Sequence, residues 1–289
     1  MKVHLLDGTY ELFRHYFAVP KKQTADGTEV GAMIGVLGSV LGMFEGGVTH
    51  LGVATDHVIE SFRNDLWPGY KSSAGIEKDL LAQFWPLEEA LDAMGVVVWP
   101  MTDLEADDAL AIGAKVAAAD KRVEQVLICT PDKDVAQCVT GKRVVQFDRR
   151  KREMRDEAGV VNRFGVKPSS IPDYLALTGD SSDGFPGLKG WGPKSAATVL
   201  AAFGHIEAVP DSWREWKLDL RGADRLSRTL NEDRELALLF KDLATLRDDA
   251  PLLGSVDELL WRGPTPEFAG VCERLEAPEL ASRASALHR

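Results

Sequence analysis

The stretch MKVHLLD, residues 1–7, decides the fold. Its apolar residues predict a short buried strand that ends in an aspartate, Asp7. The same pattern recurs in THLGVATD and VLICTPD, which end at Asp56 and Asp132. Apolar strands of this kind are typical of a sheet that is covered on both faces.

Helical periodicity separates these strands. Apolar residues recur at helical spacing in residues 29–44, 80–94 and 104–119, and a further strand is expected at residues 96–99. Strands and helices in alternation predict an α/β fold with a mostly parallel sheet. In such sheets, ligands bind at the carboxyl ends of the strands, which is where the three aspartates fall.

Three further acidic clusters join these strand ends, at residues 105–108, 132–134 and 180–183. Each cluster alone also fits a helix cap or an Asx turn, and that alternative stays open for each one separately. Together at one sheet edge, the carboxylates would repel one another unless cations were bound.

Carboxylates without soft ligands suit Mg²⁺ or Mn²⁺. A pair of such ions hydrolyses phosphodiesters, because one ion lowers the pKa of the attacking water and the other stabilises the leaving oxygen. The pattern therefore predicts a metal-dependent nuclease with two or more ions. The acidic residues concerned are Asp7, Asp56, Glu105, Asp107, Asp108, Asp132, Asp134, Asp180 and Asp183.

The stretch LKGWGPKSA, residues 188–196, predicts the hairpin of a helix-hairpin-helix motif. Two glycines flank one apolar residue, and a helix is expected to begin at Pro193. Backbone N–H groups and the helix N-terminus would grip a DNA phosphate without reading sequence. The alternative is a turn that only reverses the chain. The expected DNA contacts are Lys189, Gly190, Trp191, Gly192, Lys194 and Ser195, with Trp191 exposed.

Two polar segments could face a nucleic acid. Residues 61–78 interleave basic and aromatic side chains, which suits a single strand, although a solvated linker would look similar. Residues 141–155 carry seven basic and two acidic residues and are expected to form a hairpin, which either contacts a duplex backbone or is merely solvated. The candidate contacts in the first segment are Arg63, Tyr70, Lys71 and Lys78.

The bulk composition limits the class of protein. A net charge of −11 would disfavour a nucleic-acid partner unless the acids gather to hold cations. Three cysteines and no CxxC pair argue against a disulfide framework and against structural zinc. The N-terminus has no apolar signal region, and no stretch is long and apolar enough for a membrane span. We expect a soluble, cytoplasmic protein.

Five segments resemble, in order and spacing, the motifs of the flap endonuclease and 5′–3′ exonuclease family, which includes the 5′ nuclease domain of bacterial DNA polymerase I. They are LLDGTYELFRHYFA, ATDHVIESFRNDLWPGYK, DLEADDALA, TPDKDVAQCV and LTGDSSDGFPGLKGWGPKSA, and they lie within residues 1–205. No polymerase sequence follows, so a free-standing enzyme is expected.

The resemblance implies a PIN-like (FEN-type) nuclease core with a helical arch and a helix-3-turn-helix (helix-hairpin-helix) DNA-binding unit. We expect the core at residues 1–165, with the arch at about 62–80, the DNA-binding unit at 166–210 and a C-terminal helical region at 211–289. The family usually reads YKANR where this chain reads YKSSAG, so Lys78 is the candidate substitute for a missing arginine, and a reduced arch is expected.

The resemblance also implies residue roles. The acids of the first metal site are matched by Asp7, Asp56, Glu105 and Asp107, and those of the second by Asp132, Asp134 and Asp183. Additional acids are matched by Asp108 and Asp180. Lys71 matches a lysine that contacts the scissile phosphate, and Arg63 and Tyr70 match neighbouring phosphate and base contacts. The hairpin in this family also tends to hold a K⁺ ion.

The function expected from residues and resemblance together is a structure-specific 5′ nuclease, a monomer with 5′–3′ exonuclease and flap endonuclease activity in DNA replication or repair. Its substrates would be 5′ flaps, nicked or gapped duplex and 5′ ends. Two alternatives stay open. A non-catalytic DNA-junction binder would bind flaps without cleaving them at any Mg²⁺ or Mn²⁺ concentration. A PIN-type ribonuclease would be separated by assaying RNA and DNA flaps side by side.

Overall fold

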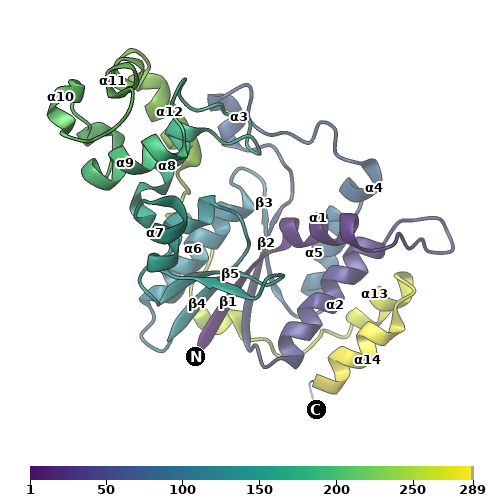
Figure 1. The fold of residues 1–289 in the computed structure, drawn as a ribbon. Coiled ribbons are helices and arrows are strands. Elements are labelled where there is room, and N and C mark those ends of the chain that lie inside the picture. Colours follow the sequence, from purple (N-terminus) through teal and green to yellow (C-terminus); the bar gives the residue numbers. More distant parts are fainter. Residues whose placement is uncertain (288–289) are drawn as a thin grey trace. The chain divides into compact units, whose positions relative to one another are not determined.

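The chain forms two compact units, each assembled from separate stretches of sequence. The computed structural model describes residues 1–287 (Figure 1). The first unit contains Met1–Ile59, Ser73–Thr130 and the chain from Arg247 onward, and the second contains Glu60–Ser72 and Pro131–Leu246. Residues 60–72 thus belong to the second unit, and the C-terminal segment returns to the first.

Parallel strands form the centre of the first unit. They are β1 (Lys2–Asp7), β2 (His50–Asp56), β3 (Val97–Met101) and β4 (Gln125–Cys129), in the order β3-β2-β1-β4. In this register Asp7 lies opposite Ala54, so β1 and β2 end side by side. The strands expected from the apolar runs are confirmed, and so is the α/β class with its mostly parallel sheet.

Helices cover both faces of these strands (Figure 1). On one side lies α6 (Ala106–Ala119), and on the other lie α1 (Gly8–Ala18), α2 (Gly31–Glu45) and α5 (Phe84–Ala93). The periodicity predicted α2, α5 and α6 but not α1. The reason is that α1 buries only Gly8, Glu11 and Leu12, so it has no apolar stripe.

The large side chain of Trp99 requires glycine at two neighbouring positions of this core. A Cβ at Gly52 of β2 would lie 2.6 Å from the indole of Trp99, and one at Gly113 of α6 would lie 2.9 Å from it. Both glycines therefore let the large ring pack between strand and helix. The C-terminal segment completes this unit with a short 3₁₀ turn at Val256–Leu259 and with α13 (Phe268–Arg274) and α14 (Pro278–Leu287).

The second unit combines a small β-hairpin with a helical core. The hairpin is β5 (Val144–Asp148) and β6 (Glu153–Arg155), paired antiparallel within the basic segment where a hairpin was expected. The helices are α3 (Phe62–Leu66), α7 (Glu157–Phe164), α8 (Ile171–Thr178), α9 (Pro193–Phe203), α10 (Trp213–Trp216), α11 (Ala223–Glu232) and α12 (Arg234–Ala244).

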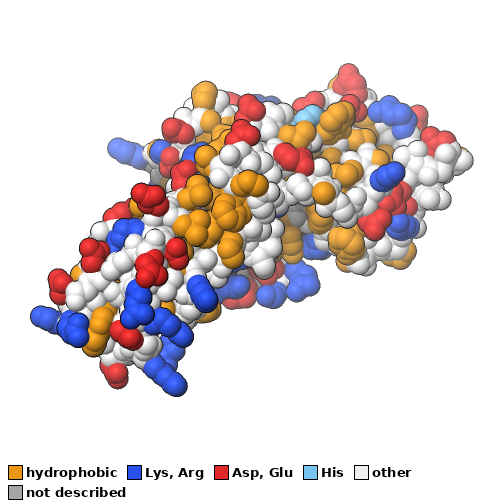
Figure 2. All heavy atoms as spheres, turned by 90° about the horizontal axis from the view of Figure 1, so that it is seen from above, with side chains coloured by type: hydrophobic (Ala, Val, Ile, Leu, Met, Phe, Trp, Pro, Cys, Tyr) orange, Lys and Arg blue, Asp and Glu red, His pale blue; other side chains and the backbone are white. Residues whose placement is uncertain are grey.

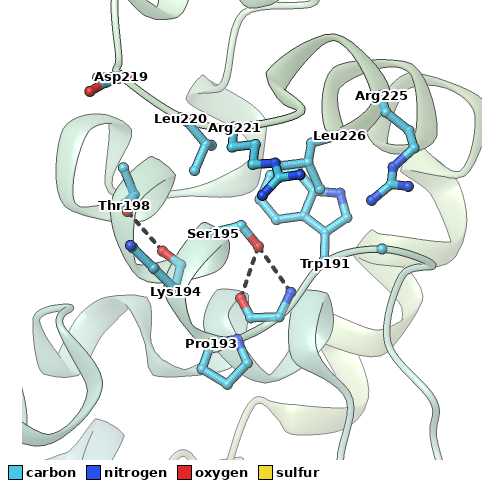
Figure 3. A pocket seen from close by; sticks show the side chains of 12 residues that line it. Trp191, Pro193, Lys194, Ser195, Thr198, Asp219, Leu220, Arg221, Arg225 and Leu226 are labelled. Atoms are coloured by element: carbon cyan, nitrogen blue, oxygen red, sulfur yellow. Dashed lines mark hydrogen bonds between the residues drawn. The ribbon is translucent and has the colours of Figure 1, made fainter.

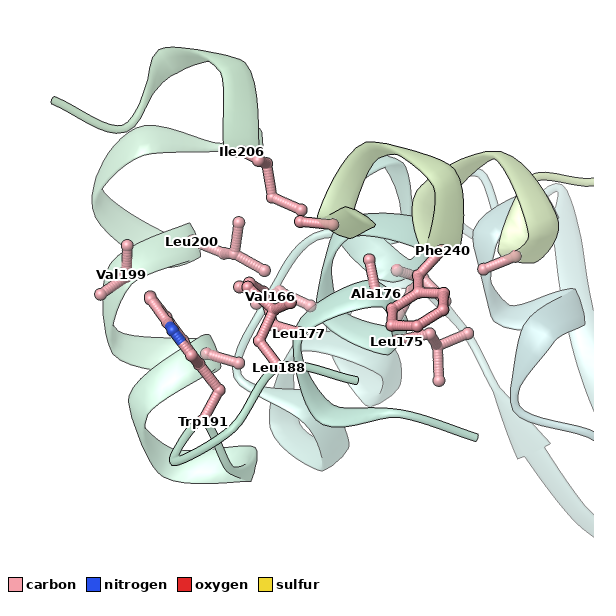
Figure 4. Close-up of a cluster of buried hydrophobic side chains, with 14 of the residues drawn as sticks. Val166, Leu175, Ala176, Leu177, Leu188, Trp191, Val199, Leu200, Ile206 and Phe240 are labelled. Carbon is pink, nitrogen blue, oxygen red and sulfur yellow. The ribbon is translucent and has the colours of Figure 1, made fainter. Parts of the chain in front are cut away.

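The helical core gathers side chains from α8, α9, α12 and the turns between them. Figure 4 shows these side chains meeting around Leu177 and Leu188. Phe240 of α12 is fully buried, 5.5 Å from the ring of Phe185 and 5.1 Å from the ring of Trp67. The contact between Trp67 and Phe240 joins residues more than 170 positions apart in sequence, so it links the two separate stretches of chain that form this unit.

The segment expected as the arch contains two short helices. They are α3, which belongs to the second unit, and α4 (Lys78–Leu81), which belongs to the first. Irregular chain lies between them, and the reduced arch stays a prediction. Within residues 1–287, none of the helices combines the length and the hydropathy that a membrane span requires.

Phe240→Ala should lower the free energy of unfolding by about 3–5 kcal/mol, because it removes a fully buried ring and leaves a cavity. The measurement is urea denaturation followed by circular dichroism. The matched control is Val161→Ala, since Val161 is 39% exposed and its truncation should cost less than about 0.5 kcal/mol. Equal losses for the two variants would contradict the packing described here.

Candidate metal sites and nucleic-acid interface

Asp7 joins three elements of the first unit. It ends β1 and caps α1, because its Oδ1 accepts a hydrogen bond of 2.8 Å from the N–H of Tyr10. Its Oδ2 accepts one of 2.9 Å from the hydroxyl of Thr130, the residue after β4. The Asp7 carboxylate is therefore fixed at the carboxyl ends of two neighbouring parallel strands.

Asp56 fixes the end of β2 in the same way. Its backbone N–H donates to Thr9 Oγ1 over 2.8 Å, and its Oδ1 accepts from the N–H of Ala106 over 2.8 Å. Ala106 is the first residue of α6, so these bonds hold the N-termini of α1 and α6 at the end of β2. The first turn of α6 brings Glu105 and Asp107 to the same place.

These carboxylates are withdrawn from water. Asp7, Asp56 and Glu105 are 7%, 8% and 4% exposed. Burial of several like charges is unfavourable unless dipoles or cations compensate it. The N-terminus of α6 supplies part of that compensation. Carboxylate oxygens are the donors that a hard divalent cation prefers. We call Asp7, Asp56, Glu105 and Asp107 the strand-end carboxylates.

Asp108 has a structural place in the first unit. It is fully buried, and its Oδ2 accepts from the N–H of Glu105 over 2.9 Å. Its Oδ1 accepts from the N–H of Arg247 over 2.8 Å. Asp108 thus caps α6 and ties down the start of the C-terminal segment. The additional metal role that the sequence suggested for Asp108 stays a prediction.

Three carboxylates of the second unit lie closest together. Asp134, Asp180 and Asp183 place one oxygen each within 4.8 Å of one another. Within residues 1–287, no other group of three Asp, Glu, His or Cys side chains brings its ligand atoms so close together. Asp134 and Asp180 are 5% and 2% exposed, and the side chain of Asp183 is 13% exposed. We call these three residues the carboxylate triad.

Two lysines border the carboxylate triad. Lys133 Nζ lies 2.7 Å from Asp180 Oδ2, and Lys71 Nζ lies 3.3 Å from Asp183 Oδ1. Burial alone would lower the pKa of Lys133, but the hydrogen bond to Asp180 and the charges of the nearby aspartates outweigh it and raise the pKa. Lys133 therefore stays protonated and neutralises part of the acidic charge.

Lys71 is held at the triad by its backbone. Its N–H donates to the carbonyl of Asp183 over 3.0 Å, and the Trp67 indole N–H donates to the carbonyl of Gly184 over 3.1 Å. Gly184 has φ of +83°, and a Cβ there would lie 2.0 Å from the carbonyl oxygen of Gly69. Only glycine allows residues 67–71 to approach this closely.

Asp132 lies outside the triad. Its side chain is exposed, and its Oδ1 accepts from the N–H of Asp134 over 3.0 Å, which makes an Asx turn. The sequence placed Asp132 beside Asp134 and Asp183 as a metal ligand. In this structure it orders the turn that carries Asp134.

Arg63 and Tyr70 are interior residues, although the sequence suggested substrate contacts. Arg63 is 1% exposed, and its guanidinium donates to the carbonyl of Leu243 over 2.8 Å and to that of Thr245 over 3.2 Å. These are carbonyls at the end of α12, where a cation is favoured. Tyr70 is 5% exposed in the helical core. Lys78, at the start of α4, is exposed.

The predicted hairpin is present between α8 and α9. Gly190 has φ of +86°, and Pro193 is the first residue of α9. The N–H of Trp191 donates to the carbonyl of Leu188, and that of Gly192 donates to Ser195 Oγ over 2.9 Å. Those two amides are used within the turn. The amides of Lys194 and Ser195 have no acceptor within the helix and are the ones an anion would meet.

Trp191 points inward rather than toward solvent, contrary to the expectation. It is 7% exposed and lies 6.2 Å from Trp216. The sequence could not show this, because Trp216 comes from a later helix. Lys189, Gly190 and Lys194 are exposed, as a nucleic-acid contact requires.

The hairpin forms one wall of a cavity of about 680 Å³. The opposite wall contains Arg221 and Arg225, which Figure 3 shows reaching toward the hairpin from the segment before α11 and from α11 itself. A Cβ at Gly190 would lie 3.6 Å from Arg225 Nη2, so this guanidinium passes close over the turn. Sequence reasoning missed both arginines, because nothing in their local pattern links them to the hairpin.

Basic side chains gather at this end of the second unit. Figure 2 shows Lys and Arg side chains intermingled with Asp and Glu side chains over the α10 and α11 region. Several of these side chains are exposed, among them Arg214, Lys217, Arg221, Arg225 and Arg228. Exposed acids, namely Glu215, Asp219 and Asp224, lie among them, so the positive charge beside the hairpin comes from the two cavity arginines and not from a basic surface.

Two family models match most of the chain. Residues 2–165 match the family model of the 5′-3′ exonuclease N-terminal resolvase-like domain, and residues 166–267 match that of the 5′-3′ exonuclease C-terminal SAM fold. A 5′-3′ exonuclease of Buchnera aphidicola is 31% identical over 254 residues, which are 86% of this chain and 88% of that protein.

DNA polymerase I of Pseudomonas aeruginosa is 34% identical over 91% of this chain, but the chain spans only 29% of the polymerase. Two solved structures share the fold. T5 5′-exonuclease with bound zinc has a TM-score of 0.65 at 20% identity and covers 99% of this chain and 98% of its own. The catalytic core of Rad2 in complex with DNA substrate has a TM-score of 0.62 at 14% identity, over 99% and 92%.

Arg63→Met should lower the free energy of unfolding by about 2–3 kcal/mol, because it leaves the carbonyls at the end of α12 without their charged donor. Urea denaturation measures this. Arg150→Met, on an exposed residue of the basic hairpin, is the matched control and should leave stability within about 0.5 kcal/mol. Unchanged stability in Arg63→Met would show that the side chain is available to a ligand instead.

Proposed function

Because this chain belongs to the 5′-3′ exonuclease family, we propose that it is a metal-dependent structure-specific 5′ nuclease that hydrolyses DNA. Its substrates would be 5′ flaps, nicked or gapped duplex and 5′ ends. The observation that carries this proposal is the carboxylate triad, in which three largely buried acids meet with a lysine ammonium at their edge.

The donor set of the triad fits Mg²⁺ or Mn²⁺. It offers carboxylate oxygens only, and no cysteine or histidine belongs to it. Asp134, Asp180 and Asp183 would hold one ion, and the strand-end carboxylates would hold another. When bound, such ions lower the pKa of water and stabilise charge on a leaving oxygen.

The chain's own residues would position the phosphodiester. The Lys71 ammonium, held 3.3 Å from Asp183, offers a positive charge to a phosphate oxygen and would orient it beside the acids. Lys133 neutralises Asp180, which limits repulsion between the triad and the phosphate. Turns and the start of a short 3₁₀ helix carry these groups, and the hydrogen bond from the Lys71 N–H to the Asp183 carbonyl keeps two of them together.

The hairpin cavity would bind the duplex part of the substrate. The amides of Lys194 and Ser195 and the guanidinium groups of Arg221 and Arg225 line it, and they suit backbone phosphates, which carry no sequence information. A K⁺ ion at the hairpin carbonyls, as the family resemblance implies, would add to this phosphate contact.

Asp134→Asn and Asp183→Asn should each reduce cleavage of a 5′-flap DNA by about a hundredfold or more, because a charged ligand of the cation is lost. EDTA should abolish cleavage by the unmodified protein. Glu235→Gln, on an exposed residue of α12, is the control that should cleave normally.

The same variants separate lost chemistry from lost folding. Without added metal, Asp183→Asn should melt close to the unmodified protein, since the loss of one repelling charge offsets the loss of the ion pair with Lys71. Mg²⁺ or Mn²⁺ should raise the melting temperature of this variant less than that of the unmodified protein, because only the strand-end carboxylates keep all their charged ligands. Full cleavage by both variants, or in EDTA, would overturn the proposal.

Arg221→Ala combined with Arg225→Ala should weaken duplex binding and reduce the slope of log K against log salt by about 2, one for each phosphate contact. Fluorescence anisotropy with Ca²⁺ in place of Mg²⁺ measures binding. Arg228→Ala, on an exposed arginine of α11 that does not line the cavity, is the control. An unchanged slope in the double variant would exclude the cavity as a phosphate site.

A further inference from the structure

Trp85 is an exposed indole that is held in place by several contacts. It stands second in α5 and is 58% exposed. Its Nε1 donates to the carbonyl of His57 over 2.9 Å. Its ring stacks on the imidazole of His57, with centroids 4.8 Å apart and planes 3° from parallel. The Trp85 indole is thus held at its edge by the hydrogen bond and on one face by the stacked imidazole.

His57 is itself held by hydrogen bonds of its side chain and of its backbone. Its Nδ1 lies 2.7 Å from Glu88 Oε2, and Glu88 Oε1 accepts from the hydroxyl of Thr55 over 2.8 Å. The backbone N–H of His57 donates to the carbonyl of Met101 over 2.9 Å. This chain of bonds anchors the stack to the ends of β2 and β3, so the indole has little freedom left to lose on binding.

A purely structural explanation of Trp85 accounts for only part of this arrangement. The buried face of α5 includes Phe84, which is 5% exposed, so the next residue has to point away from the core. Single exposed apolar residues are common. Helix geometry explains the exposure, but it requires neither the stacked histidine nor the bond from the indole edge.

The location of the stack indicates its ligand. His57 directly follows Asp56, one of the strand-end carboxylates, and both residues belong to the first unit. The His57 carbonyl that holds the indole edge thus lies one residue beyond the end of β2. A flat uncharged ring suits a nucleobase, and every base offers a face for stacking regardless of sequence. Bases within a duplex are already stacked on each other, so the base concerned must be unpaired.

We propose that Trp85, backed by His57, is a stacking platform for an unpaired base of the DNA strand that reaches the strand-end carboxylates. The assignment rests on the proposed nuclease function. It gives the enzyme a contact with a single-stranded 5′ segment that a blunt duplex cannot make, and Trp85 is a positioning residue rather than a catalytic one.

Two substitutions of Trp85 test the platform. Trp85→Leu keeps apolar bulk but removes the ring, and Trp85→Phe keeps a ring. Binding of a 5′-flap DNA is measured by anisotropy with Ca²⁺, so no cleavage is needed. Trp85→Leu should weaken binding about 5- to 100-fold, and Trp85→Phe by much less. Phe17→Leu, on another exposed aromatic residue of the first unit, is the control and should bind normally.

An abasic scan identifies the base. In flap DNA with one base removed, the unmodified protein should lose affinity at one position, by a factor similar to that of Trp85→Leu. Trp85→Leu should lose nothing further at that position, because the two changes remove the same contact. Blunt duplex should bind equally to all variants.

Unchanged flap affinity in Trp85→Leu, or equal losses at every abasic position in both proteins, would overturn the platform. If Trp85→Leu unfolds at a lower urea concentration, the comparison of Trp85→Phe with the unmodified protein in the abasic scan still decides. Failure of the nuclease proposal looks different, since the unmodified protein would then bind flaps but cleave none with Mg²⁺ or Mn²⁺.

Discussion

Buried carboxylates that repel one another are the constraint around which this molecule is built. In the first unit, Asp7 and Asp56 end adjacent parallel strands, and hydrogen bonds from Tyr10, Thr130 and Ala106 hold them there. In the second unit, Lys133 and Lys71 border the triad. Backbone dipoles and lysines compensate part of the negative charge in each unit, and divalent cations would compensate the rest.

Much of the fold could be predicted from the sequence, because apolar periodicity marks strands and helices whose burial is local. β1, β2, α2 and α6 follow from it, and the acids at strand ends follow from the topology of parallel sheets. α1 escaped prediction because it lacks an apolar stripe. Gly190 and Pro193 revealed the hairpin because their backbone requirements are local as well.

Side-chain roles that depend on distant partners could not be predicted. Arg63 binds carbonyls about 180 residues away, and Trp191 packs against Trp216, so both turn inward where the sequence suggested contact with DNA. Arg221 and Arg225 meet the hairpin only through tertiary structure. Trp85 is likewise defined by its contacts with His57 and not by any pattern in the chain. The acidic net charge conceals the two cavity arginines for the same reason.

The most direct test of the cation account is anomalous diffraction from crystals soaked in Mn²⁺. The account predicts an anomalous peak bonded to carboxylate oxygens of Asp134, Asp180 and Asp183, and a second peak at the strand-end carboxylates. Well-ordered crystals without a peak at the triad, at Mn²⁺ concentrations that support cleavage, would contradict it.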